Sequence, residues 1–381
     1  MKPRDIVLAA LAALVMVGCV WQPQAALDAA RVGLNLFLGV VLPSILPFMV
    51  CAGLLIGSGA VAAAGRALDR GMRPLFACPG CSAFALLVSM LSGYPTGARL
   101  TYDLFDAGLL NPADARRTGI LASSTGPVFM LGALGAGLMG SPAAGWVILI
   151  GHFGAVLLTG ALFSIGGNRR REAPARQENP EAMPAMQAVG ESIHRAVDTL
   201  WTVGGYIILF SVVTALLRQA GVLEPLAWGI APALQLVGLS PALAQPLLVG
   251  MLEMTNGASA IAACGAPMAQ RVAMLAALVS WGGLCIQAQS MLYLSKAGVP
   301  VGRFLLSKAV QAVLAFGLCS GLLALSPVET AVFAGLAPQP LFLSQVLLNT
   351  TAYCAGAVLA VGALTMFAGR KSKVGPSRHA E

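Results

Sequence analysis

The sequence LSGYPTGARL, residues 91–100, interrupts an apolar run that begins near Phe84. Gly93, Pro95 and Gly97 all disfavour a continuous helix, because proline removes a backbone donor and glycine costs conformational entropy. Inside a bilayer an unpaired peptide group is expensive, since no water is present to satisfy it. A helix breaker at this position therefore requires that the freed backbone groups find partners within the protein.

The composition indicates a membrane protein. Of 381 residues, 57% are hydrophobic and only 10% are charged, which is too few for an ordinary water-soluble surface. About eight segments reach the roughly 20 apolar residues that one transmembrane helix needs. These segments are 5–21, 33–57, 118–139, 143–166, 197–217, 272–295, 303–325 and 341–368. Two further apolar segments, 78–98 and 240–262, are shorter and interrupted by polar residues.

The positions of the basic residues predict how these two interrupted segments sit in the membrane. If both crossed it fully, the clusters at 169–171 and 370–373 could not both share the cytoplasmic side with Lys2 and Arg4. If both return to the side they entered from, as re-entrant hairpins, only Arg31, Arg218 and Arg271 lie outside. The two hairpins then open from opposite sides. Both termini of this multi-pass protein are expected in the cytoplasm if the first helix is not cleaved as a signal.

The net charge of +8 is better explained by this topology than by nucleic acid, because the basic residues form no stripe interleaved with aromatic residues. The partners we expect are the lipid bilayer and no nucleic acid.

The two halves of the chain align with a shift of about 160 residues, which places Gly97 on Gly257 and Gly126 on Gly283. We therefore expect an all-α polytopic protein with about eight transmembrane helices and two re-entrant hairpins in two inverted repeats. The expected parts are an N-terminal transmembrane helix or signal-like segment (1–33), repeat 1 (34–166), a cytoplasmic linker (167–196), repeat 2 (197–326), and a C-terminal transmembrane helix with a basic tail (327–381).

Polar residues at the interruptions are the candidates for a binding site. A hairpin tip leaves carbonyls and amides free to coordinate an ion or a polar solute, and nearby hydroxyls and amides add ligands. The candidate substrate-binding residues are Tyr94, Thr96, Gly97, Ser124, Thr125, Glu253, Thr255, Asn256, Gly257 and Gln287.

Glu253 stands out, because a carboxylate in an apolar segment costs on the order of 2.5–3.5 kcal/mol on insertion scales. It can bind Na⁺, carry H⁺ or pair with Arg99. Structural alternatives remain open for the whole set. Glycine and proline can serve close packing alone, and Ser123, Ser124, Gln287 and Gln289 can serve interhelical hydrogen bonds. Glu253 can equally be a structural ion pair.

No motif identifies an enzyme. The pair Cys78 and Cys81 has no second pair beside it, and His152, His194 and His379 show no ligand spacing, so metal residues stay unassigned. A phosphate-binding loop, a nucleophile elbow and a carboxylate pair are all missing from the sequence. We expect no enzyme activity and no cofactor, apart from coupling to Na⁺ or H⁺.

Three motifs together carry a family resemblance: Gly93 to Ala98, Ser124 to Pro127 and Glu253 to Gly257. With them the sequence resembles the Gate, or nucleoside-recognition, family of membrane proteins, and within it the branch of sporulation integral membrane proteins of the YlbJ type. The likeness covers roughly residues 34–326. It implies a cytoplasmic-membrane protein of a spore-forming bacterium, associated with sporulation and spore cortex formation, and related to transporter gates.

Two functions compete at this stage. In the first, the protein is a transporter-like permease whose hairpins bind or move a small polar solute of unknown identity. In the second, it is a non-transporting membrane scaffold that binds a partner protein during sporulation through the 167–196 linker. Assembly into a homo-oligomer is compatible with either function. An enzyme acting on a lipid-linked precursor is a third hypothesis, which lacks any catalytic set of residues.

Overall fold

The computed structural model describes residues 3–167 and 185–325, and every regular element in these ranges is helical. The all-α class is therefore confirmed. The predicted C-terminal span 341–368 and the basic tail lie outside the described residues.

The elements of the first half follow one another with short connections. They are α1 (Pro3–Trp21), α2 (Pro23–Leu36), the π-helix η1 (Phe37–Val41), α3 (Leu42–Gly57), α4 (Ala60–Phe76), α5 (Ser82–Ser92), α6 (Thr96–Asp106), α7 (Pro112–Leu121), the π-helix η2 (Val128–Leu138) and α8 (Pro142–Leu162). Side-chain caps in the sequence define where two of these helices begin. Asn111 accepts a hydrogen bond from the Asp114 amide at the start of α7, and Ser141 accepts one from the Ala144 amide at the start of α8.

The second half has fewer elements. They are α9 (Ala185–Gln219), α10 (Leu223–Leu236), the 3₁₀-helix η3 (Pro241–Leu243), α11 (Ala244–Leu252), α12 (Met254–Ala263), α13 (Met268–Trp281), α14 (Gly283–Leu294) and α15 (Val301–Leu325). The last part of the expected linker, 185–196, belongs to α9 and is helical, continuous with the predicted span 197–217.

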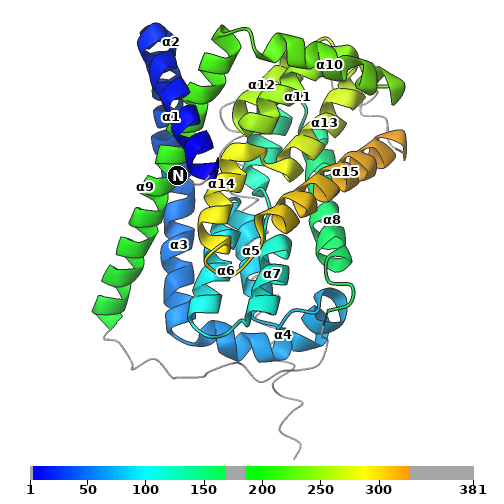
Figure 1. Ribbon diagram of the computed structural model, residues 1–381. Helices are drawn as coiled ribbons and strands as arrows, with labels where there is room; N and C mark the ends of the chain where they lie inside the picture. Colours follow the sequence, from blue (N-terminus) through cyan, green and yellow to red (C-terminus); the bar gives the residue numbers. More distant parts are fainter. Residues whose placement is uncertain (1–2, 168–184, 326–381) are drawn as a thin grey trace, which may run out of the picture.

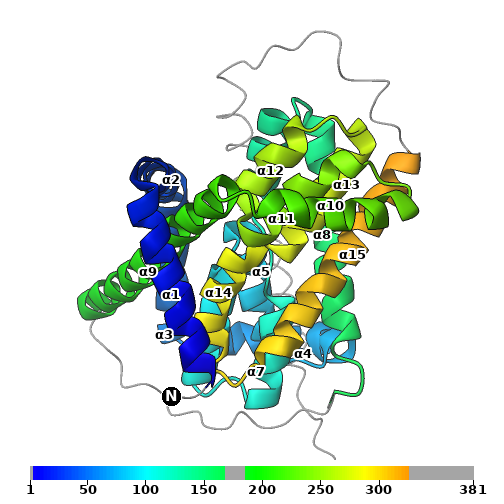
Figure 2. The same ribbon diagram turned by 45° about the horizontal axis from the view of Figure 1, so that its top comes forward.

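Each half contains a long helix, a helix lying across one end, a hairpin of two short helices, a broken helix and a final long helix. Figure 1 shows the crossing helix of the first half, α4, at the opposite end of the molecule from its counterpart α10, and the tilted view of Figure 2 brings α10 to the front. The hairpin α5–α6 follows α4 and the hairpin α11–α12 follows α10, so the two hairpins point toward each other. Inverted repeats produce this arrangement.

Four described helices are long and apolar enough to cross a membrane: Pro142–Leu162, Met186–Gln219, Met268–Leu294 and Val301–Leu325. The number rises to six if each of two sharply bent pairs, Ala9–Trp21 with Pro23–Gly39 and Ile45–Gly57 with Ala60–Phe76, counts as one span. The described residues thus support a polytopic protein without confirming the count of eight.

Two spans that we expected to be continuous are broken. The predicted span 118–139 consists of α7 and η2, joined by non-helical residues from Ala122 to Gly126. The predicted span 272–295 corresponds to Met268–Leu294, which is long and apolar enough to cross a membrane but is interrupted at Gly282, where α13 and α14 meet. Both Gly282 and the following Gly283 have positive φ, a conformation that interrupts a right-handed helix and favours glycine.

The largest buried apolar cluster lies where the two halves interlock. It joins η2 and α8 of the first half to α12, α13 and α15 of the second, and its buried members include Met130, Leu134, Ile148, Ile261 and Leu275. In a bilayer such contacts stabilise mainly through close packing, because lipid is as apolar as the side chains. The cluster therefore holds η2 and α13, which each border one of the two breaks, against α8 and α15.

Candidate functional site

Each hairpin tip lies against the break of the helix that follows it. A Cβ on Gly93, in the first tip, would lie 2.9 Å from the Gly126 amide nitrogen in the α7–η2 break. A Cβ on Gly283, at the α13–α14 break, would lie 3.0 Å from the amide nitrogen of Met254 in the second tip. The pairing of Gly126 with Gly283, proposed from the sequence repeat, thus has a structural counterpart in both halves.

Tyr94 connects the first tip to the second half. Its hydroxyl lies 3.3 Å from the Ser123 carbonyl in the first half and 3.4 Å from the Val279 carbonyl near the end of α13. Thr125 makes a parallel connection, since its hydroxyl donates to the same Val279 carbonyl at 3.2 Å. The two predicted residues Tyr94 and Thr125 therefore meet at one carbonyl of the opposite repeat.

His152, in the middle of α8, touches both broken helices. Its Nε2 lies 3.0 Å from the Thr125 amide and 3.0 Å from the Ser124 hydroxyl, and its Nδ1 lies 2.7 Å from the Ser280 hydroxyl. The ring is fully buried. Ser124 is tied further to the first hairpin, because its amide donates to the Ser89 hydroxyl of α5 at 3.2 Å.

Lys308 of α15 lies at the same centre, with only 1% of its surface exposed. Its ammonium donates to the Tyr94 hydroxyl at 2.6 Å, to the Gln311 side-chain oxygen at 2.9 Å and to the Ser123 carbonyl at 3.0 Å. These acceptors are neutral, and within residues 3–167 and 185–325 no carboxylate forms an ion pair with Lys308. A buried lysine without a counter-ion is costly, and in membrane proteins such residues mark functional sites.

The sequence motifs did not single out Lys308 or His152 as site residues. Lys308 was available to the rule that singled out Glu253, since it is an ionisable residue inside a predicted span. His152 was considered only as a metal ligand, whereas its role here is to hold two segments by hydrogen bonds.

The remaining predicted residues of the first hairpin have different environments. Thr96 is buried and its hydroxyl has no hydrogen-bond partner among the described residues. Gly97 serves close packing, because a Cβ there would overlap the Ala122 carbonyl and lie 2.6 Å from the Ser89 side chain. The first hairpin can close only with glycine at this position.

In the second hairpin, Glu253 caps α12. Its two carboxylate oxygens accept hydrogen bonds from the amides of Thr255 at 2.9 Å and Asn256 at 2.7 Å. Gly257 packs directly against the backbone of Gly250 on α11. Within the described ranges, no hydrogen bond joins the side chains of Thr255 or Asn256 to Lys308.

Arg99 does not pair with Glu253. It forms an ion pair with Asp103, one turn along α6, at 2.9 Å, and it donates to the Thr199 hydroxyl of α9 at 3.1 Å. Its guanidinium also lies 5.2 Å from the centre of the Tyr293 ring. Arg99 thus joins the first hairpin to the second half beside the centre.

Gln287, on α14, spans the α13–α14 break by donating to the Trp281 carbonyl at 3.0 Å. Its side-chain oxygen is buried without a partner in the described part of the chain, as are the Ser123 hydroxyl and the Gln311 side-chain nitrogen. Such groups carry a penalty of about 1–3 kcal/mol each unless a partner is supplied. Together with Thr96 and Lys308 they offer both donors and acceptors to a polar ligand.

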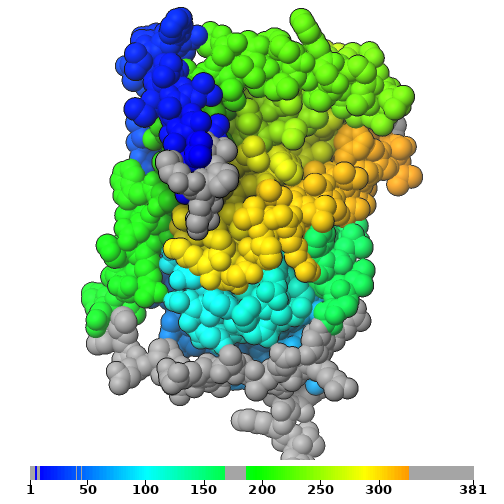
Figure 3. All heavy atoms as spheres, viewed as in Figure 1, coloured from blue at the N-terminus to red at the C-terminus, as the bar shows by residue number. Residues whose placement is uncertain are grey.

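This centre is enclosed by protein. Figure 3 shows the yellow and orange atoms of α14 and α15 lying across the middle of the face, above the cyan atoms of the first hairpin region. Access to the centre therefore requires these elements to move.

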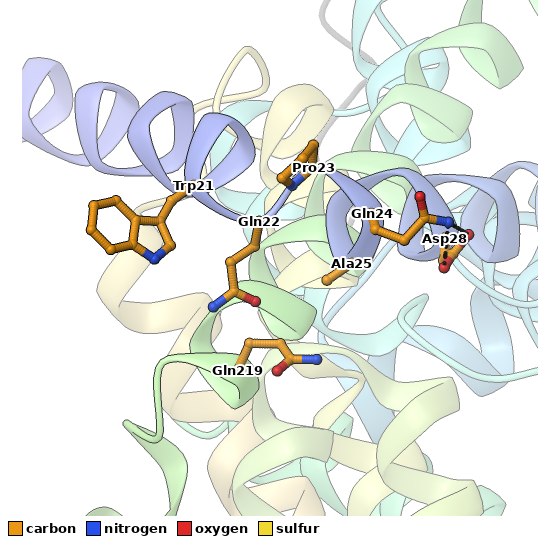
Figure 4. A pocket seen from close by; sticks show the side chains of 7 residues that line it. All are labelled: Trp21, Gln22, Pro23, Gln24, Ala25, Asp28 and Gln219. Carbon is orange, nitrogen blue, oxygen red and sulfur yellow. Dashed lines mark hydrogen bonds between the residues drawn. The ribbon is translucent and has the colours of Figure 1, made fainter.

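An open pocket of about 510 Å³ lies elsewhere, at the bend between α1 and α2. Trp21, Gln22 and Gln219 face it, together with Pro23, Gln24, Ala25 and Asp28 (Figure 4). It contains none of the predicted site residues, so we place the candidate site at the centre and not in this pocket.

A metal site finds no support in the described residues, where no group of three or more His, Cys, Asp or Glu side chains comes together. Cys78 and Cys81 are buried free thiols. The Cys78 sulfur accepts a long hydrogen bond from Thr118, and the Cys81 sulfur donates one to the Leu109 carbonyl. Both thiols therefore have local structural contacts.

Comparison with known proteins gave two matches. The family model described as Gate, nucleoside recognition, matches residues 38–142 and 200–366. The chain is 29% identical over 332 residues to the sporulation integral membrane protein YlbJ of Bacillus subtilis (strain 168), an alignment that covers 82% of this chain and 81% of the relative. No solved structure matches the chain significantly. The matched ranges of the family model leave out His152 but include the other residues that meet at the centre, namely Tyr94, Ser123, Ser124, Thr125, Val279, Ser280, Lys308 and Gln311.

Proposed function

The chain belongs to the nucleoside-recognition, or Gate, family of membrane proteins, and from this premise we propose that it binds and moves a small polar solute at the centre where the first hairpin tip and the α7–η2 break meet α13 and α15. The likeness to an integral membrane protein of sporulation and the apolar helices support an integral, multi-pass membrane protein that acts in sporulation. A part in spore cortex formation belongs to the proposal. The proposal includes no catalytic step.

One observation carries the proposal: Lys308 is buried at the meeting point of the broken helices with no carboxylate among the described residues to balance its charge. Its partners Tyr94, Gln311 and the Ser123 carbonyl are all neutral. An anionic group on the solute would supply the missing charge, because a charged hydrogen bond in a low dielectric is about twice as strong as a neutral one.

Unpaired polar atoms offer further contacts to the ligand. Ser123 and Gln311, which both contact Lys308 through other atoms, leave a hydroxyl and a donating nitrogen unpaired, and the predicted residues Thr96 and Gln287 leave a hydroxyl and an accepting oxygen unpaired. A small solute with one acidic group and further hydrogen-bonding groups fits this set. A purely apolar ligand does not, since it would leave every one of these atoms unpaired.

The architecture supports movement of the solute as part of the proposal. The two hairpins follow crossing helices at opposite ends of the molecule (Figure 1), so displacing elements on one side or the other would open the centre to that side. Coupling of this movement to Na⁺ or H⁺ belongs to the proposal.

The test is ligand-dependent stabilisation of the purified full chain in lipid nanodiscs. A panel of small organic acids, neutral polar solutes such as nucleosides and amino-acid amides, and organic cations is screened by thermal unfolding, with Lys308→Met as the comparison. We expect stabilisation by members of the organic-acid group, lost in Lys308→Met. Stabilisation confined to neutral solutes or cations, or equal in the variant, would overturn the role of Lys308. If no solute stabilises the protein and no solute is taken up in an ion-dependent way, the proposed function is overturned.

The scaffold hypothesis predicts a different pattern in cells. Deleting residues 168–184 would then abolish the sporulation phenotype, while Lys308→Met would leave it intact. The proposal predicts the reverse result for both variants.

A further inference from the structure

We infer that His152 is a positioning residue whose neutral ring holds the two unwound segments of the site together, and that protonation of this ring releases them. The inference concerns the regulation of the proposed solute site and rests on it for the effect on solute binding. The hydrogen-bond arrangement itself stands independently of any solute.

The contacts of His152 determine where its proton is. The Thr125 amide can only donate, so Nε2, 3.0 Å away, must accept and cannot carry a hydrogen. A neutral imidazole then carries its hydrogen on Nδ1, which donates to the Ser280 hydroxyl at 2.7 Å. The ring therefore bridges the α7–η2 break of the first half and the end of α13 in the second half.

Protonation would reverse the contact at Nε2. The imidazolium would present an N–H to the Thr125 amide N–H, so two donors would face each other and the buried amide would lose its acceptor. Thr125 also holds the Val279 carbonyl through its hydroxyl, the same carbonyl that lies beside the Tyr94 hydroxyl. Displacing Thr125 would therefore disturb the contact between the two halves at the centre.

The charged surroundings of His152 come from α15. Lys308 donates to the Ser123 carbonyl, next to Ser124, whose hydroxyl contacts the ring. The other titratable groups of α15 that face α8 are Arg303, which donates to the Phe163 carbonyl, and Cys319, which packs against Gly151. No residue of η2 is titratable, and α8 itself carries no other charged residue.

The charges on the remaining neighbours of α8 lie away from the ring. Arg117 of α7 contacts Asp114 and the Ala77 carbonyl, near the C-terminal end of α8. Arg271, at the start of α13, donates to the Ala262 carbonyl. The charged residues of α4, including the pair Arg73 and Asp69, also lie near the C-terminal end of α8, where Phe76 approaches Gly160.

The test is hydrogen–deuterium exchange of the segment 122–127, measured against pH on the full chain in nanodiscs and corrected for the intrinsic exchange rate. In the wild type we expect protection at neutral pH and a single-step loss on acidification, with exchange about tenfold faster, which corresponds to about 1.4 kcal/mol. Absence of this step in the folded wild type would overturn the inference.

Two variants distinguish the hydrogen bond at Nε2 from the hydrogen bond at Nδ1. His152→Asn places an amide near the Nδ1 position and has no acceptor for Thr125, so exchange should be fast at every pH. His152→Gln can place its oxygen near the Nε2 position, which restores the acceptor without a titrating group, so exchange should stay slow at every pH. His194→Gln, on the exposed face of α9, is the matched control and should keep the wild-type step.

If His152→Asn does not fold, ring ¹⁵N signals of histidine-labelled wild type, assigned with His152→Gln, give the same answer. A neutral ring with its hydrogen on Nδ1 supports the inference, and an Nε2–H ring or an imidazolium at neutral pH overturns it. A pH step that persists in His152→Gln also overturns it. If the step is present and assigned but no solute binds to any variant, the His152 arrangement stands and the proposed solute function fails.

Discussion

The ammonium of Lys308 donates a 2.6 Å hydrogen bond to the hydroxyl of Tyr94, and it lies 4.8 Å from the centre of the same ring. The two residues are 214 positions apart, one on the last described helix and one in the tip of the first hairpin. This contact joins α15 to the tip of the first hairpin, which has the sequence GYPTGA at residues 93–98. The site is therefore built by both halves of the chain.

The first prediction concerns the Tyr94 hydroxyl. Tyr94→Phe removes an acceptor from a buried ammonium, and a hydrogen bond to a charged group contributes about 1.5–3 kcal/mol. We expect the free energy of unfolding in detergent to fall by about this amount, and a double-mutant cycle with Lys308→Met to give a coupling of about 0.5–3 kcal/mol.

Tyr102→Phe is the matched control on the same hairpin, since the Tyr102 hydroxyl forms no hydrogen bond with any described residue and its loss should change stability by less than about 0.5 kcal/mol. Equal effects for Tyr94→Phe and Tyr102→Phe, or a zero coupling with Lys308, would contradict the contact.

The second prediction concerns Glu253, whose two oxygens are occupied by the amides of Thr255 and Asn256. Glu253→Ala removes the cap and should lower the unfolding free energy by about 0.5–2 kcal/mol. Glu253→Gln keeps one accepting oxygen and should cost less. Thermal and denaturant unfolding measure both effects.

Because the carboxylate serves as a cap, we also expect Glu253→Gln to retain whatever ion dependence uptake shows in the wild type. Loss of that dependence, with the fold intact, would assign the coupling ion to Glu253 and contradict a purely structural role.

The hairpins were predictable from the sequence because their breakers are strong local signals. Gly93 with Pro95 cannot continue a helix, and Glu253 in an apolar run marks the corresponding position in the second half. The structure places a break at both positions. The repeat then provided the pairing of Gly126 with Gly283, each of which lies against its own hairpin tip.

The breaks at Ala122–Gly126 and at Gly282 were not predicted, because average hydropathy over a window remains high across a break of one to five residues. The signals were present as Pro127 after Gly126 and as the Gly282–Gly283 pair. The contacts of Lys308 and His152 could not be predicted in this way. The contact of His152 with Ser280 and the contacts of Lys308 with Ser123 and Tyr94 join residues 128 to 214 positions apart, and only the packed arrangement of the helices brings them together.

The third prediction concerns Arg99, which is bound to Asp103 and Thr199. Both side chains of the ion pair are largely buried, so Arg99→Gln leaves Asp103 without its partner and weakens the contact between α6 and α9. We expect a loss of about 3–5 kcal/mol in unfolding free energy, the range for breaking a buried pair.

Arg195→Gln is the matched control, because its pair with Glu191 is exposed on α9 and should contribute far less to stability than the Arg99 pair. Similar losses for the two variants would contradict the structural role of Arg99. Complete rescue of Arg99→Gln by Asp103→Asn would show that the unpaired carboxylate, and not the Thr199 contact, accounts for the loss.

The last prediction tests the closure of the second hairpin. Gly257 and Gly250 approach so closely that a Cβ on Gly257 would overlap the Gly250 backbone, which cannot rotate away as a side chain can. Gly257→Ala should therefore force α11 and α12 apart and destabilise the protein by at least about 1–3 kcal/mol, the typical cost of overpacking. Gly205→Ala on α9 is the control, since a Cβ there meets no atom within 4 Å and the gain in helix propensity is about 0.5–1 kcal/mol. Thermal unfolding of both variants in nanodiscs measures the difference.

Because α14 begins against the same tip, through Gly283, the loosened hairpin should also lower solute-dependent stabilisation. If Gly257→Ala behaves like Gly205→Ala, the two helices of the hairpin do not touch at this point and the centre is not closed from that side.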